Sequence, residues 1–347
     1  MVTNNDLGGL PLVCICIPIR NAERTIMETY NSILNQDYSN LAIHIVDNAS
    51  TDHSLDIINN KPDHRIFIHK HKTNIGGEEN FDYCITLASG KYTAIFHADD
   101  VYESTMVSKQ VAYLEANSDV GAVFTKAQTI DDNGRPMGII GGIPDGRKGV
   151  HPLDYCELLR LMLRYHNFLV CSSVMVRTEI YRDIIKVWGN PKFKSASDVN
   201  LWLRLAQCKP IAVLDEPLMK YRISTNQFSH INRTRTYRPD FFLVMDHYLA
   251  LPETRGLLTE KDFRYYGWLE RHDRVARSMN AFISGQFLES NNLLNGFYSL
   301  DLIYSALFSR RGLVTLLGGS LLRLFLLFSC SKLTVKIVTF IKGISWK

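Results

Sequence analysis

The stretch Val13-Cys14-Ile15-Cys16-Ile17 is a continuous apolar run that ends at Pro18. A strand with water on one face alternates apolar and polar residues, so an unbroken apolar run is typical of a strand that is buried on both faces. Strands of this kind belong to parallel sheets with helices on both sides. The run therefore predicts an α/β domain that begins near the start of the chain.

The residues that follow alternate between helical and strand patterns. Apolar residues recur at helical spacing from Ile26 to Leu34. Further strands are expected at 42–46, 66–68, 92–96, 121–124, 171–176 and 210–214, and further helices at 78–88, 107–114 and 198–206. The segment 134–149 is rich in Gly and Pro and is expected to be a loop. This order predicts a mostly parallel sheet flanked by helices, in which ligands bind beyond the carboxyl ends of the strands.

A pair of carboxylates follows the expected strand 92–96, in the segment His97-Ala98-Asp99-Asp100. Adjacent carboxylates repel each other unless a cation or solvent neutralises them. Mg²⁺ and Mn²⁺ prefer carboxylate and phosphate oxygens, so Asp99 could hold a metal ion together with a substrate diphosphate. The alternative is an exposed turn in which one of the two aspartates caps the next helix.

Two further aspartates stand where a site is expected. Asp47 follows the expected strand 42–46 and could accept hydrogen bonds from a nucleotide base or ribose, or could simply belong to a turn. Asp198 stands in the first turn of an expected helix. It could act as a general base, or it could only stabilise the helix N-terminus.

The order of these segments resembles that of the family 2 glycosyltransferases over about residues 11–230. The matching segments are Pro18-Ile19-Arg20-Asn21-Ala22-Glu23, Ser32-Ile33-Leu34-Asn35-Gln36, Ile45-Val46-Asp47-Asn48-Ala49-Ser50-Thr51-Asp52, Asn74-Ile75-Gly76-Gly77, Ala88-Ser89-Gly90-Lys91-Tyr92, His97-Ala98-Asp99-Asp100, Ser197-Asp198, Trp202-Leu203-Arg204-Leu205, Pro217-Leu218 and Tyr221-Arg222. The resemblance implies a GT-A fold, an inverting mechanism and a nucleotide-diphosphate sugar donor.

The resemblance also implies roles for individual residues. Asp198 would deprotonate the acceptor hydroxyl, and Asp99 would bind the divalent metal, Mn²⁺ or Mg²⁺, that holds the donor diphosphate. The residues expected to line the nucleotide-sugar pocket are Pro18, Ile19, Arg20, Glu23, Asp47, Asn74, Gly76, Ala98 and Asp99.

Two positions depart from the family pattern. His97 stands where the family usually has the first aspartate of Asp-x-Asp, and Ser224 stands where many members have a histidine. His97 could ligate a borderline metal such as Mn²⁺, could contact the ribose, or could simply be tolerated. The loss of one carboxylate should weaken Mg²⁺ affinity.

The C-terminal part has a different character. From Leu302 to Lys347 the chain carries seven basic residues and no Asp or Glu, whereas the whole chain has a net charge of +4. Two strongly apolar segments, 312–330 and 333–346, lie among these basic residues. Basic amphipathic helices lie in anionic membrane leaflets, so membrane contact is expected. The alternative is that these helices bury their apolar stripe on the protein itself or in a homodimer.

A GT-A catalytic domain is therefore expected at residues 1–236 and a helical region at 237–347. The seven scattered cysteines and the absence of a signal-peptide pattern in residues 1–12 predict a cytoplasmic protein. With the basic helices, this places the protein on the inner face of the cytoplasmic membrane. A lipid-linked saccharide acceptor in surface-polysaccharide (O-antigen or capsule) biosynthesis is then expected.

Other classes fit the chain less well. No Gly-x-Gly-x-x-Gly follows the first strand, which excludes a Rossmann dehydrogenase. A nucleotidylyltransferase would have a glycine-rich, lysine-containing loop there. Nucleic acid is not an expected partner, because the basic residues stand among Leu, Ile and Phe. The remaining alternative is a non-catalytic nucleotide-binding scaffold at the membrane with a degenerate metal site.

Overall fold

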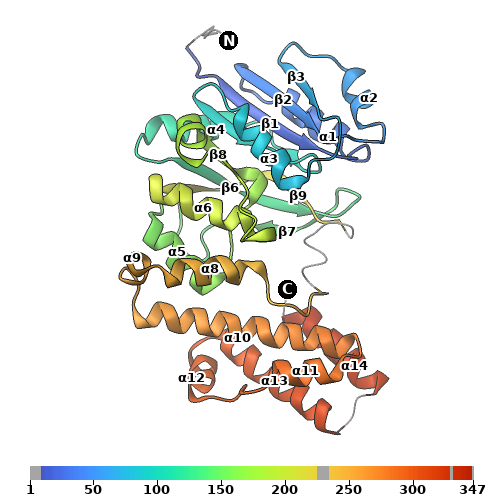
Figure 1. The fold of residues 1–347 in the computed structure, drawn as a ribbon, viewed down its shortest axis with the longest axis vertical. Coiled ribbons are helices and arrows are strands. Elements are labelled where there is room, and N and C mark those ends of the chain that lie inside the picture. Colours follow the sequence, from blue (N-terminus) through green and yellow to red (C-terminus); the bar gives the residue numbers. More distant parts are fainter. Residues whose placement is uncertain (1–8, 225–233, 329–330, 346–347) are drawn as a thin grey trace. The chain divides into compact units, whose positions relative to one another are not determined.

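The computed structural model describes residues 9–224, 234–328 and 331–345. The chain divides into two compact units (Figure 1). The first, here called the sheet unit, comprises Met1–Met162 and Asn167–Ser224, and the second, here called the helical unit, comprises Leu163–His166 and Thr225–Lys347. Cys330, Trp346 and the residues preceding Gly9 were part of the sequence predictions and lie outside the described residues.

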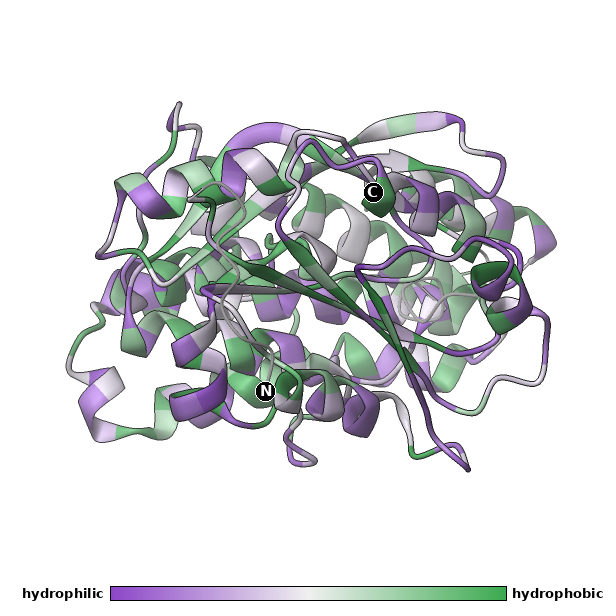
Figure 2. Ribbon diagram, turned by 90° about the horizontal axis from the view of Figure 1, so that it is seen from above, coloured by the Kyte–Doolittle hydropathy of each residue, from purple (hydrophilic) through white to green (hydrophobic). Residues whose placement is uncertain are grey.

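The sheet unit contains one mixed sheet with the strand order β3-β2-β1-β4-β8-β6-β9-β5, and β7 pairs with β6. The strands are β1 (Val13–Ile19), β2 (Leu41–Asp47), β3 (Ile66–Lys70), β4 (Tyr92–Ile95), β5 (Val101–Tyr102), β6 (Ala122–Ile130), β7 (Pro136–Ile140), β8 (Met175–Arg177) and β9 (Ile211–Arg222). The first four strands pair in parallel, as expected, whereas β5, β7 and β8 pair antiparallel. Figure 2 shows the hydrophobic central strands in green.

The strand β1 is buried on both faces, as its unbroken apolar run predicts. Its odd-numbered residues, such as Ile15 and Ile17, belong to the core formed with α1 and α4. Its even-numbered residues face α3, where the Cys16 thiol lies 3.5 Å from the carbonyl oxygen of Cys84. Two helical layers therefore enclose the strand, and its carboxyl end opens toward the site described below.

Six helices belong to the sheet unit. They are α1 (Ile26–Leu34), α2 (Ser54–Asn59), α3 (Gly77–Thr86), α4 (Met106–Ala116), α5 (Tyr155–Tyr165), whose last residues belong to the helical unit, and α6 (Ser197–Cys208). Trp202 of α6 packs edge-to-face on Phe124 of β6, with ring centroids 4.9 Å apart. This contact anchors α6 on β6, which pairs with β9 in parallel and with β8 antiparallel.

Two predictions made from local sequence are wrong. The expected loop 134–149 contains β7, which forms a hairpin with β6 across a turn closed by Asp131. Gly134 in that turn has φ of 77°, a left-handed conformation that glycine adopts without strain. The expected strand 171–176 is a single 3₁₀ turn at Cys171–Ser173 followed by β8. The segment of β7 becomes a strand by pairing with β6 just before it, and β8 by pairing with β4 and β6, which are distant in sequence.

Every regular element described in the helical unit beyond Thr234 is a helix. These helices are α8 (Asp240–Ala250), α9 (Pro252–Arg255), α10 (Glu260–Ile283), α11 (Phe287–Leu293), α12 (Leu300–Phe308), α13 (Arg310–Phe328) and α14 (Lys332–Ser345). Their core includes Phe282, Phe297 and Leu322. A Cβ atom on Gly319 of α13 would lie 2.2 Å from the Phe297 ring, so glycine permits this close packing. The polar Arg323 donates to the carbonyl of Leu294 at 2.5 Å.

Candidate active site

An open cleft of about 530 Å³ lies beyond the carboxyl ends of β1, β2 and β4, and is here called the strand-end cleft. It is lined by Pro18, Ile19, Arg20, Asn21, Ala22, Thr25, Asn48, Asn74, Gly76, Gly77, Asn80, Phe81, His97, Ala98 and Asp99. The candidate site residues found among these are Pro18, Ile19, Arg20, Asn74, Gly76, His97, Ala98 and Asp99. Parallel pairing brings these segments together from distant parts of the chain, because it places their strand ends at one sheet edge.

Hydrogen bonds between side chains and backbone hold two walls of this cleft together. The side-chain oxygen of Asn21 accepts from the Thr51 N–H at 2.8 Å, and Ser54 Oγ accepts from the Ala22 N–H at 2.8 Å. Asn21 has φ of 48°, a left-handed conformation that asparagine tolerates better than most residues. The loop after β1 is thereby fixed to the loop after β2.

Asp47 and Glu23 do not line the strand-end cleft. Asp47 is buried, and its Oδ1 accepts a hydrogen bond from the Ser50 N–H at 3.1 Å. Glu23 Oε2 accepts from the His53 N–H at 3.1 Å, at the start of α2. Both carboxylates thus stabilise the loop after β2, which is the structural alternative that the sequence left open for Asp47.

Asn48 is a lining residue that the sequence analysis did not single out. Its amide nitrogen donates to the Gly76 carbonyl at 2.7 Å, and its amide oxygen accepts from the Ile75 N–H at 2.8 Å. Asn48 therefore holds the loop 74–77 against the end of β2. Its place next to Asp47, directly after a strand, was the signal that could have identified it.

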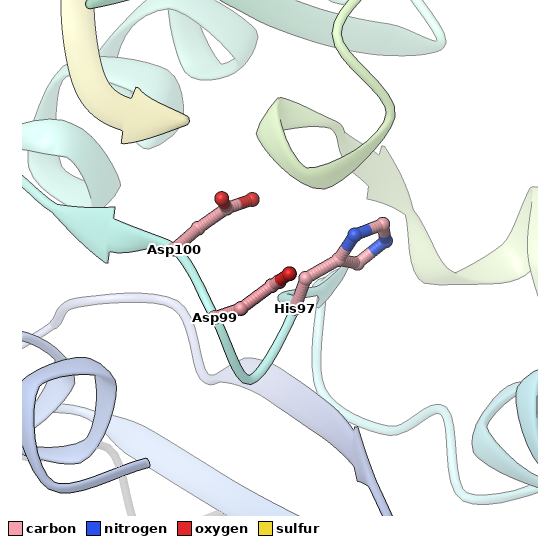
Figure 3. Close-up of side chains that lie close together, drawn as sticks. All are labelled: His97, Asp99 and Asp100. Carbon is pink, nitrogen blue, oxygen red and sulfur yellow. The ribbon is translucent and has the colours of Figure 1, made fainter. Parts of the chain in front are cut away.

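His97, Asp99 and Asp100 form a cluster at the end of β4 whose ligand atoms all lie within 4.8 Å of one another (Figure 3). Asp100 is already engaged by the protein: Ser172 Oγ donates to one oxygen at 2.5 Å and the Arg222 N–H donates to the other at 3.0 Å. Burial, and then the neighbouring charge of Asp99, raise the pKa of Asp100 well above its usual value. Asp99 lines the cleft.

His97 is partly buried, and its buried Nε2 atom has no hydrogen-bond partner within the described ranges. Burial lowers the pKa of His97, while Asp99 opposes this effect. A neutral imidazole offers a lone pair, and a buried polar atom without a partner is costly unless a ligand completes it. The residues therefore fit a metal ion that accepts one nitrogen and carboxylate oxygens, such as Mn²⁺.

Asp198 stands in the first turn of α6 and is not a lining residue of the strand-end cleft. Burial raises the pKa of Asp198 to about 6, against the opposing hydrogen bond from the Val199 N–H. Its other oxygen accepts from Asn167 at 3.4 Å. Burial, and then the charges of Asp198 and Asp100, raise the pKa of Cys171 well above its usual value.

Helix α3 connects the strand-end cleft to the segment that leads into Asp198. Glu78 Oε1 accepts from the Ser197 hydroxyl at 2.6 Å, and Asp82 Oδ1 accepts from the Trp188 N–H at 2.5 Å. Phe81, which lines the cleft, packs on the Trp188 ring with centroids 4.7 Å apart. The local sequence pattern did not identify Glu78, Phe81 or Asp82 as residues near the site, because their partners are more than a hundred residues away in the chain.

Comparisons with known proteins agree with this arrangement. The model of glycosyl transferase family 2 matches residues 14–185. An uncharacterized glycosyltransferase of Haemophilus influenzae is 32% identical over 228 residues, which are 65% of this chain and 69% of that protein. The UDP-Glc:alpha-D-GlcNAc-diphosphoundecaprenol beta-1,3-glucosyltransferase WfaP of Escherichia coli is 36% identical over 198 residues, 56% of this chain and 70% of that protein. The chain belongs to glycosyltransferase family 2 and is a glycosyltransferase.

Two solved structures share its fold. S. aureus TarS 1-349 in complex with UDP-GlcNAc has a TM-score of 0.57 at 19% identity, covering 82% of this chain and 80% of that chain. The mannosyltransferase PcManGT from Pyrobaculum calidifontis, in complex with GDP-Man and Mn²⁺, has a TM-score of 0.53 at 16% identity, covering 97% and 88%. The fold is therefore GT-A, with a mixed sheet and a helical C-terminal region.

Proposed function

We propose that this protein is an inverting glycosyltransferase that moves a sugar from a nucleotide-diphosphate donor to a hydroxyl of a lipid-linked saccharide. The observation that carries the proposal is the strand-end cleft, where the segment 18–22, the loop 74–77 and the His97–Asp99 pair meet. Its volume of about 530 Å³ is in the range of small-molecule sites.

The donor nucleotide occupies the strand-end cleft in this proposal. Arg20 and the loop 74–77 face the same space, so the nucleoside lies along the ends of β1 and β2. The diphosphate lies near Asp99 at the end of β4. The roles of Glu23 and Asp47 are to hold the loop walls in place, as their hydrogen bonds to backbone N–H groups suggest.

Asp99 and His97 would hold the metal ion, and Asp100 is the third group of the cluster. When bound, a divalent cation neutralises the charge that develops on the departing diphosphate. The nitrogen ligand favours Mn²⁺ over Mg²⁺. PcManGT, which shares the fold, was solved with Mn²⁺.

Asp198 is the general base of the reaction. Its carboxylate takes the proton of the acceptor hydroxyl as that oxygen attacks the anomeric carbon from the face opposite the donor diphosphate. The bond from the anomeric carbon to the diphosphate oxygen breaks, and its electron pair leaves with the nucleoside diphosphate. A carboxyl with a pKa of about 6 is ionised at neutral pH and is a stronger base than an ordinary aspartate.

Two observations support the proposed acceptor and the proposed location: the activity named for one relative, and the apolar surface of the helical unit. WfaP, named above, acts on a sugar linked to diphosphoundecaprenol. One helix of the described chain, α13, is long and apolar enough to cross a membrane by length and composition. One face of α13, including Thr315 and Leu322, is buried, whereas Leu317 and Leu327 are exposed. We place the protein at the inner face of the cytoplasmic membrane, with this apolar surface in the interface.

The test is turnover of a panel of UDP-, GDP- and dTDP-sugars with a lipid-linked saccharide acceptor, with Mn²⁺, with Mg²⁺ and with a chelator. We expect one donor to be consumed, product of inverted anomeric configuration, and faster turnover with Mn²⁺. Asp99→Asn should abolish the metal response. Product that retains the donor configuration contradicts the mechanism. Nucleotide binding without turnover of any donor would favour the non-catalytic scaffold instead.

A further inference from the structure

A second cleft, also of about 530 Å³, lies entirely within the helical unit and is here called the basic cleft. Its lining residues are Arg164, Tyr165, Lys261, Arg264, Tyr265, Trp268, Tyr304, Ser305, Phe308, Ser309 and Arg311. Four of these side chains are cationic and none is a carboxylate. The other large side chains are aromatic, so the basic cleft combines positive charge with flat apolar surface.

The α10 residues of this lining stand at positions 261, 264, 265 and 268, the spacing of one helix face. Tyr304 and Phe308 come from α12, and Arg311 comes from the first turn of α13. The Arg164 guanidinium lies over the Tyr265 ring at 4.4 Å, and the Arg264 guanidinium lies over the Tyr304 ring at 5.4 Å. The aromatic rings thus hold the cations in place around the opening.

The four cations have no carboxylate partner in the described part of the chain. Within the residues that the structure describes, no carboxylate forms an ion pair with Arg164, Lys261, Arg264 or Arg311. The nearby Asp301 accepts hydrogen bonds from Trp268 and Arg271, both at 3.0 Å. Arg164, Lys261 and Arg264 are exposed and can reach a ligand from solvent, whereas Arg311 is partly buried, so an anion bound in the cleft would offset the cost of burying its charge.

Arg311 is the partly buried cation of the basic cleft. Its guanidinium donates to the Arg164 carbonyl at 2.5 Å, which brings two cationic residues together. Burial lowers the pKa of Arg311; Tyr165 opposes this effect, and the charge of Arg164 adds to it. Arg311 in turn contributes to lowering the pKa of the buried His272, after burial itself. Ser309 Oγ caps the start of α13 by accepting from the Gly312 N–H at 2.9 Å, and a helix start favours an anion.

The rim of the basic cleft continues into exposed apolar surface. Phe308 lines the cleft and is 69% exposed, and its neighbours on α12, Leu300 and Leu307, are 87% and 74% exposed. On α13, Leu313 and Leu317 are also exposed. Free phosphate has no apolar part that could contact this rim. An anionic headgroup attached to a hydrocarbon chain matches both parts.

We propose that the basic cleft binds the diphosphate headgroup of the lipid that carries the acceptor saccharide, with the lipid chain against the exposed face of α12 and α13. Arginine and lysine suit this ligand because they donate several charge-assisted hydrogen bonds to phosphate oxygens. This inference rests on the proposed lipid-linked acceptor, but lipid binding is measured without any sugar transfer.

The test is flotation of the full chain with three kinds of vesicle. These are phosphatidylcholine alone, phosphatidylcholine with a long-chain polyisoprenyl diphosphate, and phosphatidylcholine with phosphatidylglycerol at the same surface charge. We expect the wild-type chain to bind the diphosphate vesicles more tightly than the phosphatidylglycerol vesicles. The double variant Lys261→Gln/Arg264→Gln changes two exposed side chains and should reduce binding to the diphosphate vesicles by about 30-fold, because each basic residue near an anionic surface contributes about 1 kcal/mol.

The matched control is Lys332→Gln/Lys336→Gln, which removes the same charge from exposed positions of α14 outside the basic cleft. It should keep the preference for the diphosphate lipid. Equal losses in both double variants, or equal wild-type binding to both anionic vesicles, would show general attraction to negative surfaces and overturn the proposal. Asp198→Asn, tested in parallel, should bind the vesicles like the wild type but lose sugar transfer. A failure of the catalytic proposal would therefore appear in the transfer assay and not in the binding assay.

Discussion

The strand-end cleft and the basic cleft have the same volume, about 530 Å³, and different chemistry. The first has His97 and Asp99 at one end and one cation, Arg20, and its other lining residues are neutral. The second has four cations, several aromatic rings and no carboxylate. Size alone would not distinguish a nucleotide site from a lipid-headgroup site. The histidine and carboxylate that could hold a metal ion in the first cleft, and the four cations of the second, distinguish the two sites.

The largest expected effect is on the chemical step in the sheet unit. Asp198→Asn should lower kcat by about 10³-fold, because a positioned general base contributes about 10²–10⁴-fold and an amide cannot take the proton. Affinity for the donor, measured by calorimetry, should stay close to that of wild type. Asp56→Asn is the matched control, since Asp56 also lies in the first turn of a helix but at the exposed α2. Wild-type kcat in the Asp198 variant would contradict its role.

The next largest effect separates the two adjacent carboxylates at the end of β4, Asp99 and Asp100. Asp100→Ala removes the acceptor of the Arg222 N–H and the partner of Ser172, so unfolding free energy should fall by about 2–3 kcal/mol. Asp99→Ala should change it far less, because it also removes a charge that repels Asp100. Urea denaturation of both metal-free variants checks this. Equal losses would mean that Asp99 is as structural as Asp100.

The pH dependence of sugar transfer should report the ionisation of Asp198. The base must be ionised to accept a proton, and the pKa of Asp198 is raised to about 6. Activity should therefore fall below pH 6, by about tenfold for each further pH unit, and level off above it. An ordinary aspartate would put this limb about two units lower. The residual activity of Asp198→Asn should lack the limb, and a limb that persists there would assign it to another group.

The smallest expected effect is on the pH dependence of stability, and it comes from His272 of the helical unit. Burial, and then the charge of Arg311, lower the pKa of His272 from 6.5 to about 3. Below pH 6.5 the unfolded chain takes up a proton that the folded chain does not, so stability falls as the pH drops from 7 toward 5.5. The loss should be on the order of 1 kcal/mol at pH 5.5. His272→Gln should reduce this slope in denaturation curves, and an unchanged slope would exclude His272 as its source.

Much of the fold could be predicted from local pattern. The apolar run at β1, the helical spacing of α1 and the turn formers after Asp47 all belong to segments whose own residues favour the observed conformation. The strands β7 and β8 could not be predicted in this way, because their own residues are weakly patterned and their conformation depends on pairing, of β7 with the preceding β6 and of β8 with the distant β4 and β6.

The candidate site also contains residues that could be predicted from the sequence and residues that could not. Residue type and position after a strand were enough to make Asp99 a candidate, whereas His97 and the segment 18–20 became candidates through the resemblance to the family. They were not enough to assign Asn48 to the cleft and Asp47 to the turn, since the two are neighbours with similar side chains. Only the hydrogen bonds of the folded chain distinguish them.

The sequence was sufficient to establish the α/β character of the first part, the basic and apolar character of the last part, and the residues capable of chemistry. These are properties of short segments, and local residue patterns carry them. The tertiary structure alone decided which of Asp99 and Asp100 faces the cleft, why Asp198 has a raised pKa, and that four cations from residues 164 to 311 surround one cavity. Each of these depends on burial and on partners distant in sequence, which exist only once the chain has folded.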